Sequence, residues 1–245
     1  MTYGPERYSA IAGDGGSNVR SAKIKINAEF PWILNIYDPC HNLNLFLKDL
    51  GKLFKDTLII VSGIANYFGK SNYGTFHLDV QRKMEGVQEG IKSTAETRFS
   101  SSYLQVVSVH DCMSPIKKCV ASGTLKFDTK ATKKLLPYIK EGTQHWKFMA
   151  EMSGFIQLLS SGANTILTLE GQNTNCADVF YAWVCIAYHL EQVLASPEVR
   201  VTYLRDNVIG IYNHRFGQMM EESSHKIFLL GYYLHPCESL SLKSR

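Results

Sequence analysis

Two aspartates in the first forty residues have the side-chain type and the neighbours needed for metal or phosphate chemistry. Asp14 follows the short apolar run 9–13 and is followed by two glycines, and Asp38 follows the apolar run 32–37. A carboxylate at the end of a strand is a hard oxygen ligand of the kind that Mg²⁺ or Mn²⁺ prefers. His41, three residues after Asp38, has the chemistry to orient a carboxylate or a flipped base, and structural hydrogen bonding is an equally open role for it.

These side chains can meet only if the surrounding elements bring them together. The runs 9–13 and 32–37 are typical of short buried strands. Between them we expect a helix that Ser17 or Asn18 caps and that Pro31 ends, and Pro39 favours the first position of a second helix. Strands joined by a helix pair in parallel, so a right-handed crossover places Asp14 and Asp38 at one carboxyl edge of the sheet. Ligands bind at this edge in open α/β sheets.

Local roles compete with metal binding at both aspartates. The Asp14 carboxylate can stabilise the turn and cap the following helix, and Asp38 can act as the N-cap that precedes Pro39. The spacing of Gly13 and Gly15 is partly that of a dinucleotide-binding loop, but Asn18 stands where the third glycine of that loop belongs. We therefore reject a dinucleotide site.

The rest of the chain is predicted to be helical. An apolar face formed by Phe76, Val80, Met84 and Val87 marks one helix, and Trp146 is a core candidate in another. The expected helical ranges are 41–70 with a bend near residues 55–56, 75–91, 93–121 after a polar start, 129–140, 145–169, and 175 onward with a break at Pro197. A small parallel sheet followed by many helices is an α/β fold with a helical extension.

Basic residues are concentrated in the middle of the chain. Seven lysines and one aspartate between residues 117 and 140 give this stretch a net charge of +6, in a chain whose formal net charge is +4. Such a surface suits a phosphate backbone, for which Lys130, Lys133 and Lys134 are the candidate ligands, and a solvated helix face is the competing interpretation. Arg98 can clamp a phosphate with two hydrogen bonds, although a surface arginine at a helix start would have the same sequence.

Other classes of protein are disfavoured by the sequence. The six cysteines form no CxxC pair and no spacing with histidines that suits zinc, so we expect reduced thiols in an intracellular protein. The first residues lack the pattern of a signal peptide, and the most apolar segment, 57–68, is far shorter than the roughly 20 residues that cross a bilayer. We expect neither membrane insertion nor a small-molecule substrate.

Several short motifs, in this order, resemble the hAT superfamily of cut-and-paste DNA transposases. The segment 11–19 is similar to the family's second catalytic aspartate at a strand end, with Asp14 in that position. Asp38-Pro39-Cys40-His41 resembles its short acid-to-histidine motif, and Thr97-Arg98-Phe99 its threonine-arginine-aromatic signature. Further resemblances are Trp146 with Leu169-Glu170-Gly171, and the segment 230–236.

The resemblance implies a fold and a partner. It implies a partial ribonuclease-H-like core over residues 1–170 that runs into the start of a helical insertion over residues 171–245. It also implies DNA as the partner, homo- or hetero-oligomers, and the nucleus as the location. Asp14 would then be an acid of the catalytic triad and a metal ligand, with Asp38 and His41 in a supporting motif.

The family's chemistry also predicts what this chain does not do. Cleavage in this family uses three carboxylates that hold two divalent ions about 3.5–4 Å apart. Only the second carboxylate has a counterpart here, so we expect a truncated, transposase-derived protein that has lost strand cleavage and retains DNA or protein binding. We also expect the strand before Asp14 to keep a free edge, which makes the isolated chain marginally stable or dependent on a partner.

Two alternatives remain open at this stage. One is a Mg²⁺- or Mn²⁺-dependent nuclease or strand transferase, completed by carboxylates from another chain or from residues missing from an incomplete gene product. The other is a helical module that binds protein only.

Overall fold

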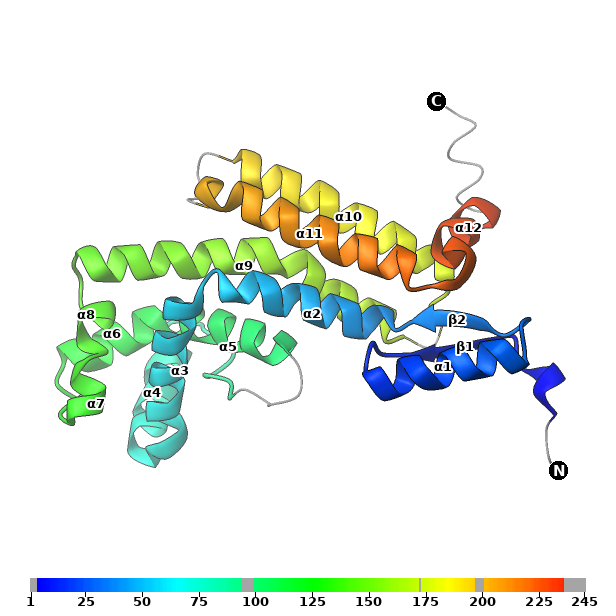
Figure 1. Cartoon of the computed structure of the whole chain (residues 1–245). Helices are drawn as coiled ribbons and strands as arrows, with labels where there is room; N and C mark the ends of the chain where they lie inside the picture. The colour runs from blue at the N-terminus through cyan, green and yellow to red at the C-terminus, as the bar shows by residue number, and fades with distance from the viewer. Residues whose placement is uncertain (1–3, 94–98, 172, 197–200, 236–245) are drawn as a thin grey trace. The chain divides into compact units, whose positions relative to one another are not determined.

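The computed structural model describes residues 4–93, 99–171, 173–196 and 201–235, and the described chain is mostly helical with one two-stranded parallel sheet (Figure 1). The chain divides into two compact units. Unit 1 comprises Met1–Phe46, Ser161–Glu191 and Asp206–Arg245, and unit 2 comprises Leu47–Ser160 and Gln192–Arg205. The predicted division at residue 170 follows from the family resemblance and stays a prediction.

Unit 1 begins with the predicted strand, helix and strand. After a short 3-10 helix, η1 (Pro5–Arg7), strand β1 (Ala10–Gly13) leads through a sharp turn into helix α1 (Ser17–Glu29), and strand β2 (Leu34–Tyr37) follows. The strands pair in parallel, with Ala10 opposite Leu34 and Gly13 opposite Tyr37. The parallel sheet predicted from the two apolar runs is thus confirmed.

Two details of this segment correct the predictions. Strand β1 is not buried, because it pairs on one side only and its alternate residues Ala10 and Ala12 are exposed. Helix α1 has Gly16 as its N-cap with no side-chain cap, so neither Ser17 nor Asn18 caps it. The residue of α1 that becomes buried is Lys23, whereas the apolar residues at helical spacing, Val19, Ala22 and Ile26, stay exposed or half-buried.

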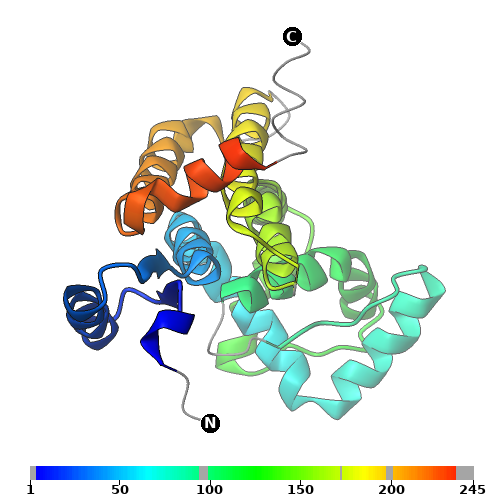
Figure 2. The same ribbon diagram turned by 90° about the vertical axis from the view of Figure 1, so that its right-hand side faces the viewer.

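The helices of unit 1 pack around an aromatic core. Trp183 is fully buried and meets the rings of Phe46, Tyr212 and Phe216 at 5.5–6.0 Å. Helices α10 and α11 lie side by side in both views (Figures 1 and 2). Besides η1 and α1, the helices that contribute to unit 1 are α2 (Pro39–Lys52), α9 (Thr143–Leu169), α10 (Cys176–Ala195), α11 (Arg205–Glu221), η3 (Ser224–Lys226) and α12 (Ile227–Leu234).

The described residues of unit 2 form helices joined by loops. Its core includes Phe54 and Phe155, whose rings meet edge to face at 5.4 Å, together with Ile64, Val109 and Ile116. Its helices, besides parts of α2, α9 and α10, are α3 (Lys55–Lys70), α4 (Asn72–Met84), α5 (Phe99–Asp111), α6 (Met113–Ala121), α7 (Lys130–Lys133), α8 (Leu136–Ile139) and η2 (Thr202–Leu204).

Two predictions in unit 2 are wrong. The helix expected over 75–91 ends at Met84, since Gly86 has a left-handed φ of 75° that breaks the helical path. The apolar face of this helix points outward, since Phe76, Val80 and Met84 are 63%, 40% and 77% exposed. Trp146 is exposed as well. Among the described residues, no helix has the length and apolar character that a membrane span requires.

Candidate functional site at the carboxyl edge of the sheet

The fold brings the two predicted aspartates to one edge of the sheet. Gly13 and Tyr37 are the last paired residues of the two strands, and Asp14 and Asp38 follow them directly. The backbone N–H of Asp38 donates to the carbonyl oxygen of Gly13 at 3.0 Å, so the ladder closes immediately below both carboxylates. The shared edge deduced from the sequence is therefore present.

Each carboxylate is engaged in a local turn. Oδ1 of Asp14 accepts the N–H of Gly16 at 3.0 Å, which stabilises the turn into α1. Oδ1 of Asp38 accepts the N–H groups of Cys40 and His41 at 2.9 and 3.1 Å, so Asp38 caps the start of α2. These bonds are local roles that compete with metal ligation: Asp14 stabilises the turn without capping α1, and Asp38 is the expected N-cap of α2.

A buried lysine occupies the space below the two acids. Lys23 is 7% exposed, and its Nζ donates to the carbonyl oxygens of Gly13 at 2.8 Å and Ile36 at 2.7 Å. One ammonium group thus links the carboxyl ends of both strands. A Cβ at position 13 would lie 3.2 Å from Cε of Lys23 and 2.8 Å from Cγ1 of Val19, so glycine is required for this approach.

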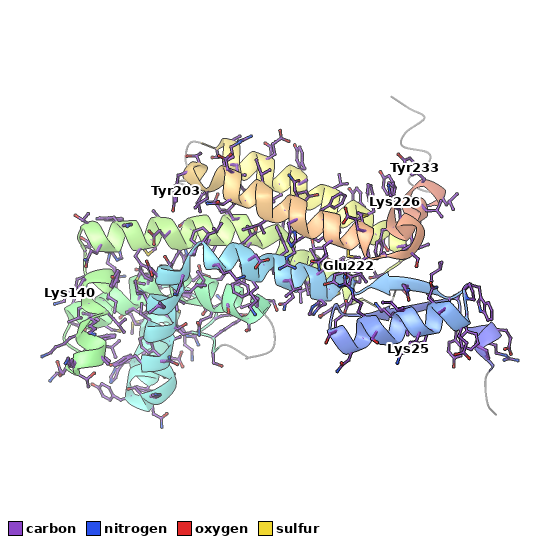
Figure 3. All side chains as sticks on the ribbon, viewed as in Figure 1. Lys25, Lys140, Tyr203, Glu222, Lys226 and Tyr233 are labelled. Atoms are coloured by element: carbon purple, nitrogen blue, oxygen red, sulfur yellow. The ribbon has the colours of Figure 1, made fainter. Side chains whose placement is uncertain are left out.

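The charges around Lys23 favour its protonated form, whereas burial opposes it. Desolvation lowers the pKa of Lys23, and the neighbouring carboxylates of Asp14, Glu222 and Asp38 partly restore it. Glu222 follows the end of α11 and approaches this edge from the far end of the chain (Figure 3). Its carboxylate also pairs with Arg20 of α1 at 3.0 Å. Acidic and basic side chains therefore lie next to one another at the carboxyl edge of the sheet.

A small pocket of about 240 Å³ lies at this edge, and Arg20, Lys23, Tyr37 and Glu222 are among its lining residues. The Tyr37 ring packs closely on the turn after β1, because a Cβ at Gly15 would lie 3.0 Å from the Tyr37 hydroxyl oxygen. Burial, followed by the nearby Glu222, raises the pKa of Tyr37. The hydroxyl consequently stays protonated at neutral pH, and the pocket is polar and of mixed charge.

This set of groups does not fit a pair of divalent cations. Mg²⁺ requires oxygen ligands in near-octahedral array, and an ammonium group beside Asp14 and Asp38 repels a second cation. Across residues 4–93, 99–171, 173–196 and 201–235, no three His, Cys, Asp or Glu side chains gather as a metal site. Asp14 as a metal ligand stays a prediction that would require further carboxylates and displacement of Lys23.

Along the side of β2 that does not pair with β1, serine hydroxyls accept the backbone N–H groups of the strand. The N–H of Tyr37 donates to Oγ of Ser223 at 3.1 Å, and the N–H of Asn35 donates to Oγ of Ser224 at 2.9 Å. Ser223 is buried, and both serines belong to the short segment between α11 and α12. Side chains from the C-terminal part of the chain thus complete the β2 edge where another strand would otherwise pair.

The other predicted residues lie elsewhere. His41 is half-buried, with its ring edge-on to Tyr37 at a centroid distance of 6.3 Å. Arg98 lies outside the described residues. Lys130, Lys133 and Lys134 belong to unit 2 and are exposed on or next to α7, which begins with a reciprocal capping box between Thr129 and Thr132.

Three residues at the edges of the sheet, Lys23, Glu222 and Ser223, were not predicted from the sequence. Lys23 lies four residues after Val19 and three before Ile26, so a lysine interrupting an apolar helical stripe was a usable signal. Ser223 and Glu222 gave no such signal, because their partners lie nearly two hundred residues away in the chain. Comparison with protein-family models, with curated proteins and with solved structures finds no match to this chain.

Proposed function

We propose that this chain is a DNA-binding protein derived from a hAT-type transposase, with a partial ribonuclease-H-like core, that binds DNA without cutting it. The order strand, helix, strand and helix, with Asp14 and Asp38 at one carboxyl edge, supports this ancestry. Its site of action in this proposal is the nucleus, alone or as an oligomer. The edge strand β1, paired on one side only, is the place where a partner strand would add.

The observation that carries the binding half of the proposal is the lysine surface of unit 2. Lys126, Lys130, Lys133, Lys134 and Lys140 are all exposed, and no ion pair neutralises any of them within the described structure. Exposed lysines that lack acidic partners attract the phosphates of DNA. When they bind, the counterions condensed on the DNA are released. The capping box at Thr129 holds α7 and its lysines in a defined position.

The observation that supports loss of cleavage is the ammonium group of Lys23. It neutralises the edge where the family's ions would bind, and it is held by two strong hydrogen bonds to backbone carbonyls. Because this ammonium group is fixed within the fold and already supplies positive charge next to Asp14, the carboxylate does not need a divalent ion.

A binding assay with a charge-matched control tests the binding half. We expect affinity for duplex DNA to fall steeply with salt, and Lys130→Glu/Lys133→Glu/Lys134→Glu to weaken it by at least about 100-fold at 0.1 M salt. The control reverses three other exposed lysines of unit 2, Lys48, Lys55 and Lys70, and changes the net charge equally. Equal loss in both variants would show a nonspecific charge effect and contradict the proposed surface.

Nicking of supercoiled plasmid tests the other half. In Mg²⁺ or Mn²⁺ we expect no nicking by the purified chain, and no difference between the chain and Asp14→Asn. Metal-dependent nicking that disappears in Asp14→Asn would establish the nuclease alternative and refute the inactive assignment.

One observation favours a second candidate, a module that binds protein through helices. Tyr73, Phe76, Val80 and Met84 form an exposed apolar stripe along α4, each between 40% and 77% exposed. A contiguous exposed apolar surface of this kind marks a site of contact with another protein. If α4 mediates self-association, light scattering should show a mass that rises with concentration in the unmodified chain. The variant Phe76→Glu/Met84→Glu should remain monomeric with unchanged DNA binding.

A further inference from the structure

Trp146, the tryptophan of unit 2, is held in place by its neighbour in the sequence. His145 is 2% exposed, and its Nδ1 lies 2.8 Å from the carbonyl oxygen of Tyr138. Because adjacent helical residues point in different directions, anchoring His145 inward turns Trp146 outward, where it is 62% exposed. The indole is thus presented on a rigid helix start.

A pocket lies next to this indole. It has a volume of about 460 Å³, which is within the roughly 300–1,000 Å³ typical of small-ligand sites. Its lining combines apolar and basic residues, and the Nζ of Lys117 connects the pocket to the tryptophan, 5.9 Å from the centre of the ring. The lining residues are Ser114, Lys117, Lys118, Val120, Ala121, Ile139, Lys140 and Glu141.

The lysines of this pocket are available to an anionic ligand. Lys117 pairs with Glu141 at 2.8 Å and Lys118 with Glu85 at 3.3 Å, and one partner of each pair, Glu141 or Lys118, is mostly exposed, so that solvent screens both pairs. Lys140 has no ion pair within the described structure, and it follows α8 at the same end of unit 2 as α7 (Figures 1 and 3). The pocket therefore lies at the same end of unit 2 as the lysines of α7.

From these features we propose that unit 2 binds single-stranded nucleic acid at this site, with a base stacked on Trp146 and the backbone phosphates on Lys117 and Lys140. The inference rests on the proposed DNA-binding function and specifies its substrate. A flat, exposed indole next to lysines is what unpaired bases and their phosphates require. A duplex keeps its bases stacked on one another, so it can use the lysines but not the indole.

Intrinsic fluorescence offers a direct test, because the chain has three tryptophans with different environments. Trp183 is fully buried, and Trp32, in unit 1, is 52% exposed and serves as the matched control for Trp146. In a Trp32→Phe protein we expect oligo(dT) and oligo(U) to quench the remaining exposed emission. Comparison of the two oligomers distinguishes a DNA from an RNA ligand.

Affinities measured by anisotropy complete the test. Trp146→Ala should weaken binding of the single strand by about 5- to 150-fold and leave duplex binding unchanged, whereas Trp32→Ala should change neither. Circular dichroism would confirm that both variants keep their helical content. Lys140→Glu should weaken binding of both the single strand and the duplex.

The possible failures are distinguishable. Duplex binding with no quenching by either oligomer, or with no effect of Trp146→Ala, would overturn this inference and leave the proposed function standing. An absence of salt-dependent binding to any nucleic acid would overturn both.

Discussion

Lys23 in unit 1 and Lys133 in unit 2 have the same side chain and opposite environments. Lys23 is buried, donates to two carbonyl oxygens and lies among carboxylates, so its charge is used entirely within the fold. Lys133 is exposed on α7, and no acidic partner neutralises it in the described structure. The first holds the sheet edge together, and the second is free to attract phosphate.

The difference separates two properties that a single lysine count would merge. At the sheet edge the polar groups satisfy one another: carboxylates cap turns, serine hydroxyls accept the outer N–H groups of β2, and an ammonium group bridges the strand ends. On unit 2 an indole and several ammonium groups face solvent. Stability should therefore respond to changes at the edge, and ligand binding to changes on unit 2.

Exchanging these two lysines for methionine should produce the largest and cleanest contrast. Lys23→Met removes two charge-assisted hydrogen bonds and leaves carboxylates without their cation, so it should lower the free energy of unfolding by about 3 kcal/mol. Lys133→Met should change stability by no more than about 0.5 kcal/mol. Urea unfolding followed by circular dichroism measures both values.

A closer control lies on the same helix as Lys23. Lys25 is exposed and its side chain points away from the sheet (Figure 3), so Lys25→Met should leave the urea midpoint unchanged. Equal destabilisation by Lys23→Met and Lys25→Met would mean that α1 loses helix propensity, and the proposed bridge would be wrong.

The serine seal on β2 should show the next largest effect. Ser223→Ala leaves the buried N–H of Tyr37 without its acceptor, which should cost about 1–3 kcal/mol. Ser17→Ala, at an exposed position that caps nothing, is the matched control and should be nearly neutral. Hydrogen exchange of the Tyr37 amide would localise the effect, and slow exchange in Ser223→Ala would contradict it.

The parts of this structure that local sequence determines were predictable, and the parts that depend on distant segments were not. Gly15 and Gly16 after an apolar run, and Pro39 after Asp38, indicated the turns, the helix starts and the shared edge of Asp14 and Asp38. Periodicity alone could not show what packs against α1, so the burial of Lys23 on that helix was not predicted. The inward side of a helix depends on what packs against it, and this is why Trp146 was wrongly taken as a core candidate.

The pH dependence of the free energy of unfolding should also distinguish buried Lys23 from the exposed lysines of unit 2. The expected effect is smaller than that of substitution, because deprotonated Lys23 still has N–H donors for its hydrogen bonds. Burial lowers the pKa of Lys23 from its ordinary 10.5, so near this pH the unfolded chain holds a proton that the folded chain has released. The stability conferred by Lys23 should then rise as the pH approaches 10.5.

The comparison of the unmodified chain with Lys23→Met isolates this dependence. Tyr37, whose pKa is raised above 10.0, acts in the opposite direction in both proteins, since its contribution is lost as the pH rises. The stability gap between the two proteins should widen as the pH rises towards 10.5. A gap that narrows there would mean that the ammonium group is stabilised in the fold, with a raised pKa.

The smallest effect should come from the ion pair between Arg20 and Glu222. The pair is short, at 3.0 Å, but the arginine side chain is 61% exposed, so solvent and salt screen it. Arg20→Met should lower the free energy of unfolding by at most about 1 kcal/mol, and less in 0.5 M salt than in 0.05 M salt. Lys23→Met, in contrast, should keep most of its cost at high salt, because its hydrogen bonds are shielded from the ions. An Arg20 effect as large and as salt-resistant as that of Lys23 would show that Arg20, too, belongs to the internal network that completes the sheet edge.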